Sequence, residues 1–270
     1  MSINGIKKVC IVGAGTMGHQ IALQCAFYDY DVNLVDVSRE ALNNARGKIR
    51  TVLTDRVNSG EISIHKMRET LSHVIYSLDL KKSAEIADFV IETVNENLEL
   101  KREVFRKLDI FSPPQTILSS NTSSLKPSRI AEFVKKPEKI IATNFENPVW
   151  ETPLVEVMGS SETSEKTIEV TKQFLQRIGL ASIIVKREIT GFVLNRIWRG
   201  IKKESLHLVD QGYISFEDLD RGYMMFHNVS SGPFMIMDRI GLDIVKNIEE
   251  TYYQESKDER DKPPNFLRIK

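Results

Sequence analysis

The sequence predicts an α/β fold: a Rossmann-type domain with a doubly wound parallel sheet, followed by an all-α C-terminal domain. Three observations lead to this prediction. Residues 7–35 read as a strand, a glycine-rich turn, a helix and a second strand. Strand-like apolar runs then alternate with helical patterns, as they do in doubly wound sheets. Beyond about residue 187 only helical periodicity remains, so we place the domain boundary between residues 187 and 188.

The chain begins with the runs VCIVGAG, TMGHQIALQCAFYD and DVNLVD. This pattern is typical of two parallel strands joined by a right-handed crossover helix. A charged stretch of helical character follows from Ser38 to about His73, with a turn near Gly60. Because this stretch has few features of a core, we expect it to project from the sheet.

Strands and helices alternate from there to the boundary. Apolar runs predict six more strands, at VIYS, DFVIET, TILSSN, IIATNF, LVEVM and LASIIV. Helical patterns between them cover residues 98–111, 127–134 and 164–178. In the C-terminal domain, helical periodicity covers residues 191–212, 216–226 and 232–256. The polar, proline-bearing tail over residues 257–270 is expected to be extended or mobile.

Composition narrows the classes of function. The 37 lysines and arginines balance 37 aspartates and glutamates, which argues against nucleic acid or a membrane surface as the main partner. The apolar run near the N-terminus is short and continues directly into GAGTMG, so it reads as a buried strand, and we predict a cytoplasmic protein. Cys10 and Cys25 lack metal or redox spacing, so we expect reduced, structural cysteines and no metal site.

The glycine-rich turn GAGTMG covers residues 13–18. In such a turn the first glycine permits the tight bend, the second lets the backbone approach a pyrophosphate, and the third allows close packing of helix on strand. A lone motif of this kind is weak evidence, but here it follows a strand and opens a helix, which favours a dinucleotide site. The predicted cofactor contacts here are Gly13, Gly15, Thr16, Met17 and Gly18.

Asp36, at the end of the next strand, indicates which dinucleotide is bound. A carboxylate accepts hydrogen bonds from the ribose 2′-hydroxyl but repels a 2′-phosphate. We therefore predict NAD, and not NADP, as the cofactor. Arg39 lies nearby, but a solvated arginine at a helix start is the favoured interpretation.

Several motifs in order resemble the 3-hydroxyacyl-CoA dehydrogenase family, including its relatives that oxidise gulonate or carnitine. They are GAGTMG, IETVNENLELKREVF, SSNTSSL, NFENPVWETPLVEV, GFVLNR and SSGPFMIMDRIGLD. The resemblance covers nearly the whole chain. It implies an NAD-binding domain over residues 1–187 and a helical domain over residues 188–270 that serves the substrate and dimerisation. It also implies a homodimer and a place in fatty acid metabolism.

The resemblance implies roles for individual residues near the nicotinamide and the substrate. Glu96, Lys101 and Asn147 would contact the nicotinamide side of the cofactor. Ser123 would contact the cofactor and hydrogen-bond the substrate hydroxyl, and Asn195 would reach that hydroxyl from the helical domain. Without the resemblance, Glu96 and Lys101 read as helix-start charges, Ser123 as a loop or capping residue, and Asn195 as a packing amide.

The family's catalytic histidine corresponds to Asn144, and Glu156 matches the carboxylate that orients this histidine. An asparagine amide has no lone pair that titrates near neutral pH, so the hydroxyl proton needs another acceptor. Glu146, two residues after Asn144 on the same face of a strand, is one candidate, with its pKa raised by burial beside Glu156. The alternatives are a solvent-facing Glu146 in a site that has drifted, and proton transfer to Glu156, directly or through water.

The sequence therefore leaves two functions open. The first is an NAD-dependent oxidoreductase that oxidises a 3-hydroxyacyl thioester of CoA or a carrier protein, or a related small hydroxy acid, to the 3-oxo product. The second is a catalytically impaired NAD-binding homologue that acts as a sensor, partner subunit or structural protein. Lys48, Arg50 and Arg56 are candidate phosphate contacts, although a solvated helix face is favoured slightly. The family usually continues into a further segment that helps to close the cofactor site, whereas this sequence ends at Lys270, so either closure is weaker or the sequence is shortened.

Overall fold

The computed structural model describes residues 5–257, 259, 262 and 263. The chain divides into two compact units between Val193 and Leu194, which we call the sheet unit and the helical unit. The boundary at residues 187 and 188 stays a prediction. Most of the tail over residues 257–270 lies outside the described residues.

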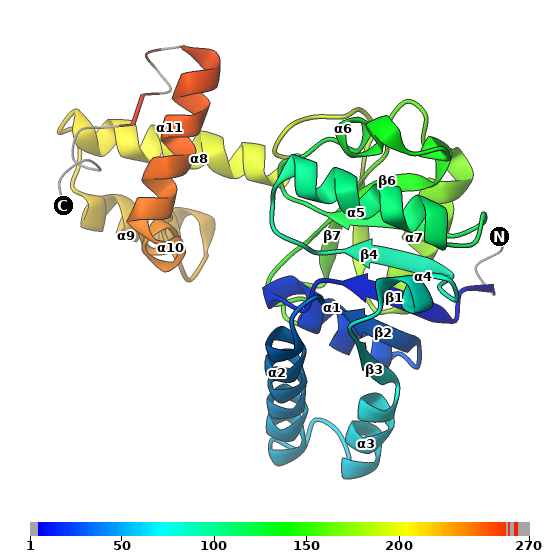
Figure 1. The fold of residues 1–270 in the computed structure, drawn as a ribbon. Helices are drawn as coiled ribbons and strands as arrows, with labels where there is room; N and C mark the ends of the chain where they lie inside the picture. Colours follow the sequence, from blue (N-terminus) through cyan, green and yellow to red (C-terminus); the bar gives the residue numbers. More distant parts are fainter. Residues whose placement is uncertain (1–4, 258, 260–261, 264–270) are drawn as a thin grey trace. The chain divides into compact units, whose positions relative to one another are not determined.

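The sheet unit is built on eight strands in the order β3-β2-β1-β4-β5-β6-β7-β8 (Figure 1). Their bounds are β1 (Lys8–Val12), β2 (Asp31–Val35), β3 (Val74–Ser77), β4 (Phe89–Glu92), β5 (Ile117–Asn121), β6 (Ile140–Phe145), β7 (Leu154–Met158) and β8 (Ala181–Val185). Strands β1 to β6 are parallel to one another. The predicted Rossmann-type sheet is confirmed, and each predicted run forms a strand.

The direction of the sheet reverses at β7. Strand β7 pairs antiparallel with β6, and β8 then runs parallel to β7. Residues 146–153 connect β6 to β7, and so short a segment cannot make the crossover that a parallel neighbour needs. The predicted parallel sheet is thus confirmed as a parallel-dominated sheet, in which β7 and β8 run opposite to β1 to β6. This reversal places β7 with its first residue at the edge where β6 ends.

Helices cover both faces of the sheet (Figure 1). They are α1 (Thr16–Phe27), α2 (Arg39–Asn58), α3 (Ile64–Ser72), α4 (Leu80–Ala84), α5 (Leu98–Phe111), α6 (Pro127–Ile130) and α7 (Glu165–Arg177), with short 3₁₀ turns at Ala131–Phe133 and Pro137–Lys139. Several starts are set by side-chain caps: Ser38, Ser63, Asn97 and Ser164 each accept a hydrogen bond from a first-turn N–H. The short helix α4 was not predicted.

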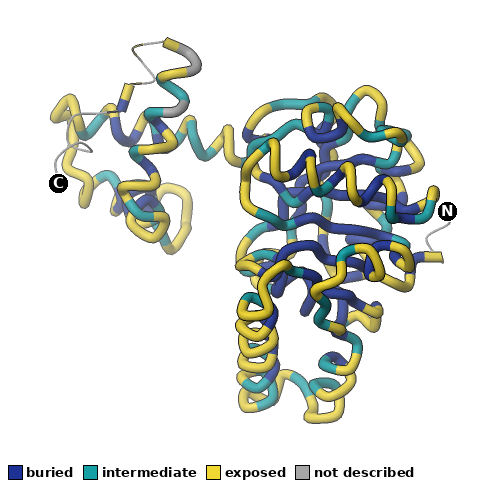
Figure 2. Tube along the Cα trace, in the orientation of Figure 1, coloured by how far each residue is buried: buried dark blue, intermediate teal, exposed yellow. Residues whose placement is uncertain are grey.

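The core lies on the two faces of the sheet. Neighbouring residues of one strand enter different apolar clusters: Ile11 and Ile91 belong to one cluster, and Cys10 and Val90 to the other, as the two-residue period of a strand requires. Figure 2 shows the central strands of the sheet buried and the outer side of α2 exposed. Helix α2 does extend from the sheet (Figure 1), yet it buries a stripe of apolar residues, Leu42, Ala45, Ile49 and Leu53. The charged stretch thus has more core than the sequence suggested.

The helical unit contains α8 (Leu194–Asp210), α9 (Phe216–His227), α10 (Pro233–Ile240) and α11 (Leu242–Ser256). Its core includes Leu206, Phe234, Met237 and Val245. The helical pattern over residues 232–256 is broken at Gly241, whose φ of +98° ends α10 and begins α11. Within the described residues, no helix is long and apolar enough to cross a membrane.

Candidate active site

The glycine-rich turn lies between β1 and α1, and its three glycines have different environments. Gly13 adopts φ +106°, and a Cβ there would lie 2.8 Å from Thr93 Oγ1. A Cβ on Gly18 would lie 1.8 Å from the Gly13 carbonyl oxygen. A Cβ on Gly15, in contrast, would meet nothing within 4 Å. The fold itself therefore excludes side chains at two of these positions, whereas the open space at Gly15 is where a pyrophosphate would approach the backbone.

The start of α1 suits the same ligand. Gly15 is the N-cap and provides no side-chain cap, and the first turn holds no acidic residue. Thr16 is exposed and Met17 half-buried. Free N–H groups and the positive end of a helix dipole attract phosphate charge. The turn and the helix start therefore fit the pyrophosphate of a dinucleotide.

Asp36 directly follows β2 and shapes the glycine-rich turn. Its Oδ2 accepts a hydrogen bond from the Ala14 N–H at 2.7 Å, and its Oδ1 accepts one from the Ser38 N–H at 2.8 Å. Each carboxylate oxygen has a further lone pair, so the carboxylate can also accept from a ribose hydroxyl. The sequence predicted only the ribose contact, and the structure adds the contact with the turn.

A buried ion pair lies where β4 and β5 end. Lys101 and Glu92 are both 0% exposed, and Lys101 Nζ lies 2.8 Å and 3.1 Å from the two Glu92 oxygens. Nζ also donates to the Asn121 carbonyl at 3.1 Å and lies 3.3 Å from Glu96 Oε2. Ser120 Oγ donates to Glu92 at 2.6 Å. Burial raises the pKa of Glu92, while the Lys101 charge and these hydrogen bonds oppose the rise. Lys101 is thus held by Glu92, a residue outside the predicted site.

Glu96 orders the loop that carries Ser123. It accepts hydrogen bonds from Thr122 Oγ1 and, at 2.7 Å, from Ser124 Oγ. Burial alone would raise the pKa of Glu96, but the Thr122 hydrogen bond, the Lys101 charge and the Ser124 hydrogen bond together lower it. Ser123, between the two bonded residues, is exposed. The loop therefore presents Ser123 outward while its neighbours are fixed.

Asn144 and Glu156 face each other across the β6–β7 pair. Asn144 Nδ2 donates to Glu156 Oε2 at 3.1 Å, and the Val193 N–H donates to Glu156 Oε1 at 2.8 Å. Glu156 is 0% exposed. Because the donor side of the Asn144 amide is turned to Glu156, its Oδ1 is the side directed away from that carboxylate.

Glu146 is the first residue after β6 and is half-buried. Burial raises the pKa of Glu146, and the negative charge of Glu156 raises it further. A carboxyl group with a raised pKa is closer to the range that suits a general base. Asn147 follows on the surface, and its Oδ1 accepts a hydrogen bond from Gln20 Nε2 at 2.7 Å.

Comparison with known proteins decides the family. The profile described as the 3-hydroxyacyl-CoA dehydrogenase NAD binding domain matches residues 8–189, and that of the C-terminal domain matches residues 191–269. The chain belongs to the 3-hydroxyacyl-CoA dehydrogenase family. It is an NAD-dependent oxidoreductase of this type, so the predicted family, activity class and cofactor are confirmed.

Relatives of this family match nearly the whole chain. A probable 3-hydroxybutyryl-CoA dehydrogenase of Bacillus subtilis is 33% identical over 97% of this chain and 91% of its own. An L-carnitine dehydrogenase of Bacillus cereus is 34% identical over 82% of this chain and 66% of its own. The crystal structure of (S)-3-hydroxybutyryl-CoA dehydrogenase from Ralstonia eutropha is 30% identical, has a TM-score of 0.92, and covers 98% of this chain and 93% of its own.

Most residues predicted for the dehydrogenase site come from the edge of the sheet where β1, β2, β4, β5 and β6 end. They are Gly13, Gly15, Thr16, Met17, Gly18, Asp36, Glu96, Lys101, Ser123, Asn144, Glu146, Asn147 and Glu156. Asn195 is different, since it is an exposed residue in the first turn of α8 in the helical unit. The roles of all these residues toward NAD and substrate stay predictions.

Proposed function

We propose that this dehydrogenase oxidises the 3-hydroxyl group of an acyl thioester, carried by CoA or a carrier protein, or of a related small hydroxy acid. The names of its relatives, a probable 3-hydroxybutyryl-CoA dehydrogenase and an L-carnitine dehydrogenase, support this range of substrates. The proposed mechanism depends on Glu146 and Glu156, the two carboxylates beside Asn144, because oxidation of an alcohol releases a proton as well as a hydride.

Asn144 and Ser123 hold the substrate hydroxyl in this proposal. The Asn144 amide donates to Glu156, so its Oδ1 is oriented as an acceptor for the hydroxyl hydrogen. Ser123 is exposed and adds a second hydrogen-bonding group. For Asn195, the family resemblance implies a contact with the substrate hydroxyl. Neither amide titrates near neutral pH, so these residues orient the substrate without taking its proton.

Glu146 is the proposed proton acceptor. NAD, when bound, supplies the acceptor for the hydride that leaves the carbinol carbon. As the carbonyl forms, the hydroxyl proton passes to the Glu146 carboxylate, which gains one proton and loses its charge. Burial and the nearby Glu156 charge raise the pKa of Glu146, and this makes the carboxylate a better base than an exposed one. Glu156 holds Asn144 in place.

The pH dependence of turnover tests this proton transfer. Protonated Glu146 cannot accept a proton, so kcat should fall as the pH drops through its raised pKa. Glu146→Gln should lower kcat by about 10²–10⁴-fold and remove this acid limb. Glu151→Gln, an exposed glutamate on the same connection, is the control and should keep the native profile. Formation of NADH from hydroxyacyl thioesters and hydroxy acids is the readout. An unchanged acid limb in Glu146→Gln would exclude Glu146 as the base.

Replacement of Asn144 by histidine separates this enzyme from a catalytically impaired NAD-binding homologue. In the proposed site an imidazole removes the amide that Glu156 holds and changes the hydroxyl position, so Asn144→His should lower kcat. A gain of about 10²-fold or more, the contribution typical of a general base, would instead indicate a site disabled by loss of histidine. Steady-state kinetics distinguishes the two outcomes, with the hydroxyacyl thioester or hydroxy acid that the native protein oxidises fastest as substrate.

Lys48 and Arg50 are the candidates for phosphate contacts if the substrate is a CoA ester. Both are exposed on α2. Burial lowers the pKa of His19, which lies in the first turns of α1, and the positive charge of Lys48 lowers it further. Arg56 is less available, because its guanidinium packs on the rings of Phe27 and Trp150 and pairs with Glu61. Lys48 and Arg50, and not Arg56, are therefore the proposed phosphate contacts.

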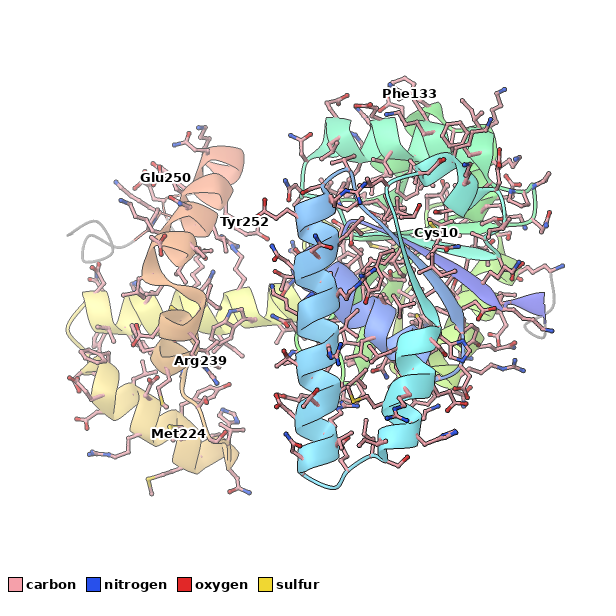
Figure 3. All side chains as sticks on the ribbon, turned by 60° about the horizontal axis from the view of Figure 1, so that its bottom comes forward. Cys10, Phe133, Met224, Arg239, Glu250 and Tyr252 are labelled. Atoms are coloured by element: carbon pink, nitrogen blue, oxygen red, sulfur yellow. The ribbon has the colours of Figure 1, made fainter. Side chains whose placement is uncertain are left out.

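A cytoplasmic homodimer that serves fatty acid metabolism completes the proposal. Cys10 and Cys25 are free and buried, and Cys10 lies on β1 inside the sheet unit (Figure 3). Burial raises the pKa of Cys10 to about 12, so the thiol stays protonated and unreactive, consistent with a reducing compartment.

The helical unit exposes large apolar side chains at Tyr213, Met225 and Phe226, which supports association through this unit.

A further inference from the structure

The side chain of Gln20 joins two parts of the cofactor site. Gln20 lies on α1 and is 5% exposed. Its Nε2 donates to the Thr16 carbonyl at 3.0 Å and to Asn147 Oδ1 at 2.7 Å. Its Oε1 accepts from the Val149 N–H at 3.0 Å. One amide therefore links the first turn of the dinucleotide helix to the turn that follows β6.

Main-chain groups fix the orientation of this amide. A backbone N–H can only donate and a backbone carbonyl can only accept. Gln20 Oε1 must therefore face Val149, and Nε2 must face Thr16. Since Nε2 is a donor, the atom of Asn147 that meets it must be the acceptor Oδ1. The usual ambiguity of asparagine and glutamine amides is thus removed for both residues.

The orientation of Asn147 has a consequence for ligand binding. Its Oδ1 is engaged by Gln20, so Nδ2 is directed to the other side of the amide. Among the residues that the structure describes, only Gln20 is hydrogen-bonded to the Asn147 side chain, and Asn147 is exposed. Asn147 therefore offers two N–H donors to whatever binds beside it.

We propose that Gln20 is a positioning residue for the cofactor. It holds the Asn147 amide so that Nδ2 donates to an acceptor oxygen on the nicotinamide side of NAD, at the carboxamide or the ribose. This rests on the proposed function, an NAD-dependent dehydrogenase, and on the place beside the nicotinamide that the family resemblance implies for Asn147. Gln20 itself need not touch the cofactor, and it acts through Asn147.

Gln24 provides a matched control on the same helix. It lies one turn further along α1, is 7% exposed, and donates through Nε2 to the Ile178 carbonyl at 2.7 Å. Gln20→Met and Gln24→Met remove the same polar groups from similarly buried positions, so both should lower the melting temperature. Only Gln20→Met should weaken NAD binding, by about fivefold in Kd, because about 1 kcal/mol is the usual contribution of one hydrogen bond. Equal Kd changes in both variants would overturn the proposal.

A double-mutant cycle shows whether Gln20 acts through Asn147. Asn147→Ala should raise the Kd for NAD, and Gln20→Met should then add less than about a twofold change, because the residue it positions is gone. Additive effects would show that Gln20 only stabilises the fold. The readout is NAD binding by titration calorimetry, which needs no hydroxyacyl substrate. A failure of the proposed substrate class therefore stays distinguishable from a failure of this inference.

Gln20→Glu gives a second test that does not depend on the stability of Gln20→Met. A carboxylate accepts from the Val149 N–H but cannot donate to Asn147, whereas its protonated form can. The Kd of Gln20→Glu for NAD should therefore approach the native value as the pH falls, relative to the native protein at the same pH. Gln24→Glu should show no such recovery. A binding defect in Gln20→Glu that is independent of pH would contradict the proposal.

Discussion

Gly15 and Gly18 lie in one turn, yet the reasons for glycine differ between them. At Gly18 a Cβ would overlap the Gly13 carbonyl, and at Gly15 the surrounding protein leaves a Cβ free. The backbone at Gly15 is extended, with φ −73° and ψ −155°, so it lies outside the positive-φ region that favours glycine. The packing of α1 on β1 therefore explains the glycine at position 18, whereas no contact within the protein requires a glycine at position 15.

These environments predict opposite behaviour of two alanine variants. Gly15→Ala should lower the free energy of unfolding by no more than about 1 kcal/mol, through the weaker N-cap, while it raises the Kd for NAD by at least about tenfold because the methyl group meets the pyrophosphate. Gly18→Ala should lower the free energy of unfolding by about 3 kcal/mol or more. Denaturation without NAD and calorimetric titration with NAD measure the two effects. Native NAD affinity in Gly15→Ala would show that the pyrophosphate lies elsewhere.

Local sequence pattern identified some site residues and missed others, for a physical reason. The glycine-rich turn and Asp36 are close in sequence, so their spacing alone predicted a dinucleotide site. The partners of Gln20 are not, because Asn147 lies 127 residues away along the chain, and nothing in the local pattern of α1 indicates that contact. Glu92 did leave a signal, since it is a charged residue in the apolar run DFVIET, which requires a buried partner.

At the scale of elements, periodicity predicted where strands and helices lie better than how they connect. All eight strands coincide with predicted apolar runs. For the central strands the reason is that a strand buried on both faces is a continuous apolar segment. The direction of β7 depends on the length of its connection, which the pattern of the strand itself does not contain. Likewise, the run over residues 232–256 is helical in pattern throughout, and only the backbone of Gly241 divides it.

The break between α10 and α11 predicts the effect of substitution at Gly241. Its φ of +98° is unfavourable for other residues, and a Cβ would lie 2.9 Å from Asp243 Oδ1. Gly241→Ala should therefore lower the free energy of unfolding by about 1–2 kcal/mol. Gly222 is the control. It is exposed inside α9, and a Cβ there would meet nothing within 4 Å. Gly222→Ala should therefore stabilise that helix by up to about 1 kcal/mol. Chemical denaturation measures both, and a stabilising Gly241→Ala would contradict the assigned backbone.

At the scale of the whole molecule, the two units have different surfaces. The described residues of the sheet unit form three apolar clusters. The helical unit has a small core and many exposed apolar side chains, including Met225 at 79% and Phe226 at 85%; the neighbouring Met224 is labelled on α9 in Figure 3. A concentration of exposed apolar side chains is a feature of surfaces that a partner covers, and most homo-oligomers are symmetric dimers in which the same surface meets itself.

The proposed homodimer therefore has a definite test. At micromolar concentration, sedimentation velocity should give twice the mass of one chain. The double variant Met225→Ser, Phe226→Ser should shift the protein toward the monomer. Its melting temperature should fall only as far as separation of the subunits requires, because both side chains are too exposed to support the core. Ile110→Ser, at an isoleucine that is 71% exposed on α5 of the sheet unit, removes exposed apolar surface from the other unit and should leave the dimer intact. A native protein that sediments as a monomer would contradict the dimer. A dimer that survives the α9 variant but not Ile110→Ser would place the interface on the sheet unit.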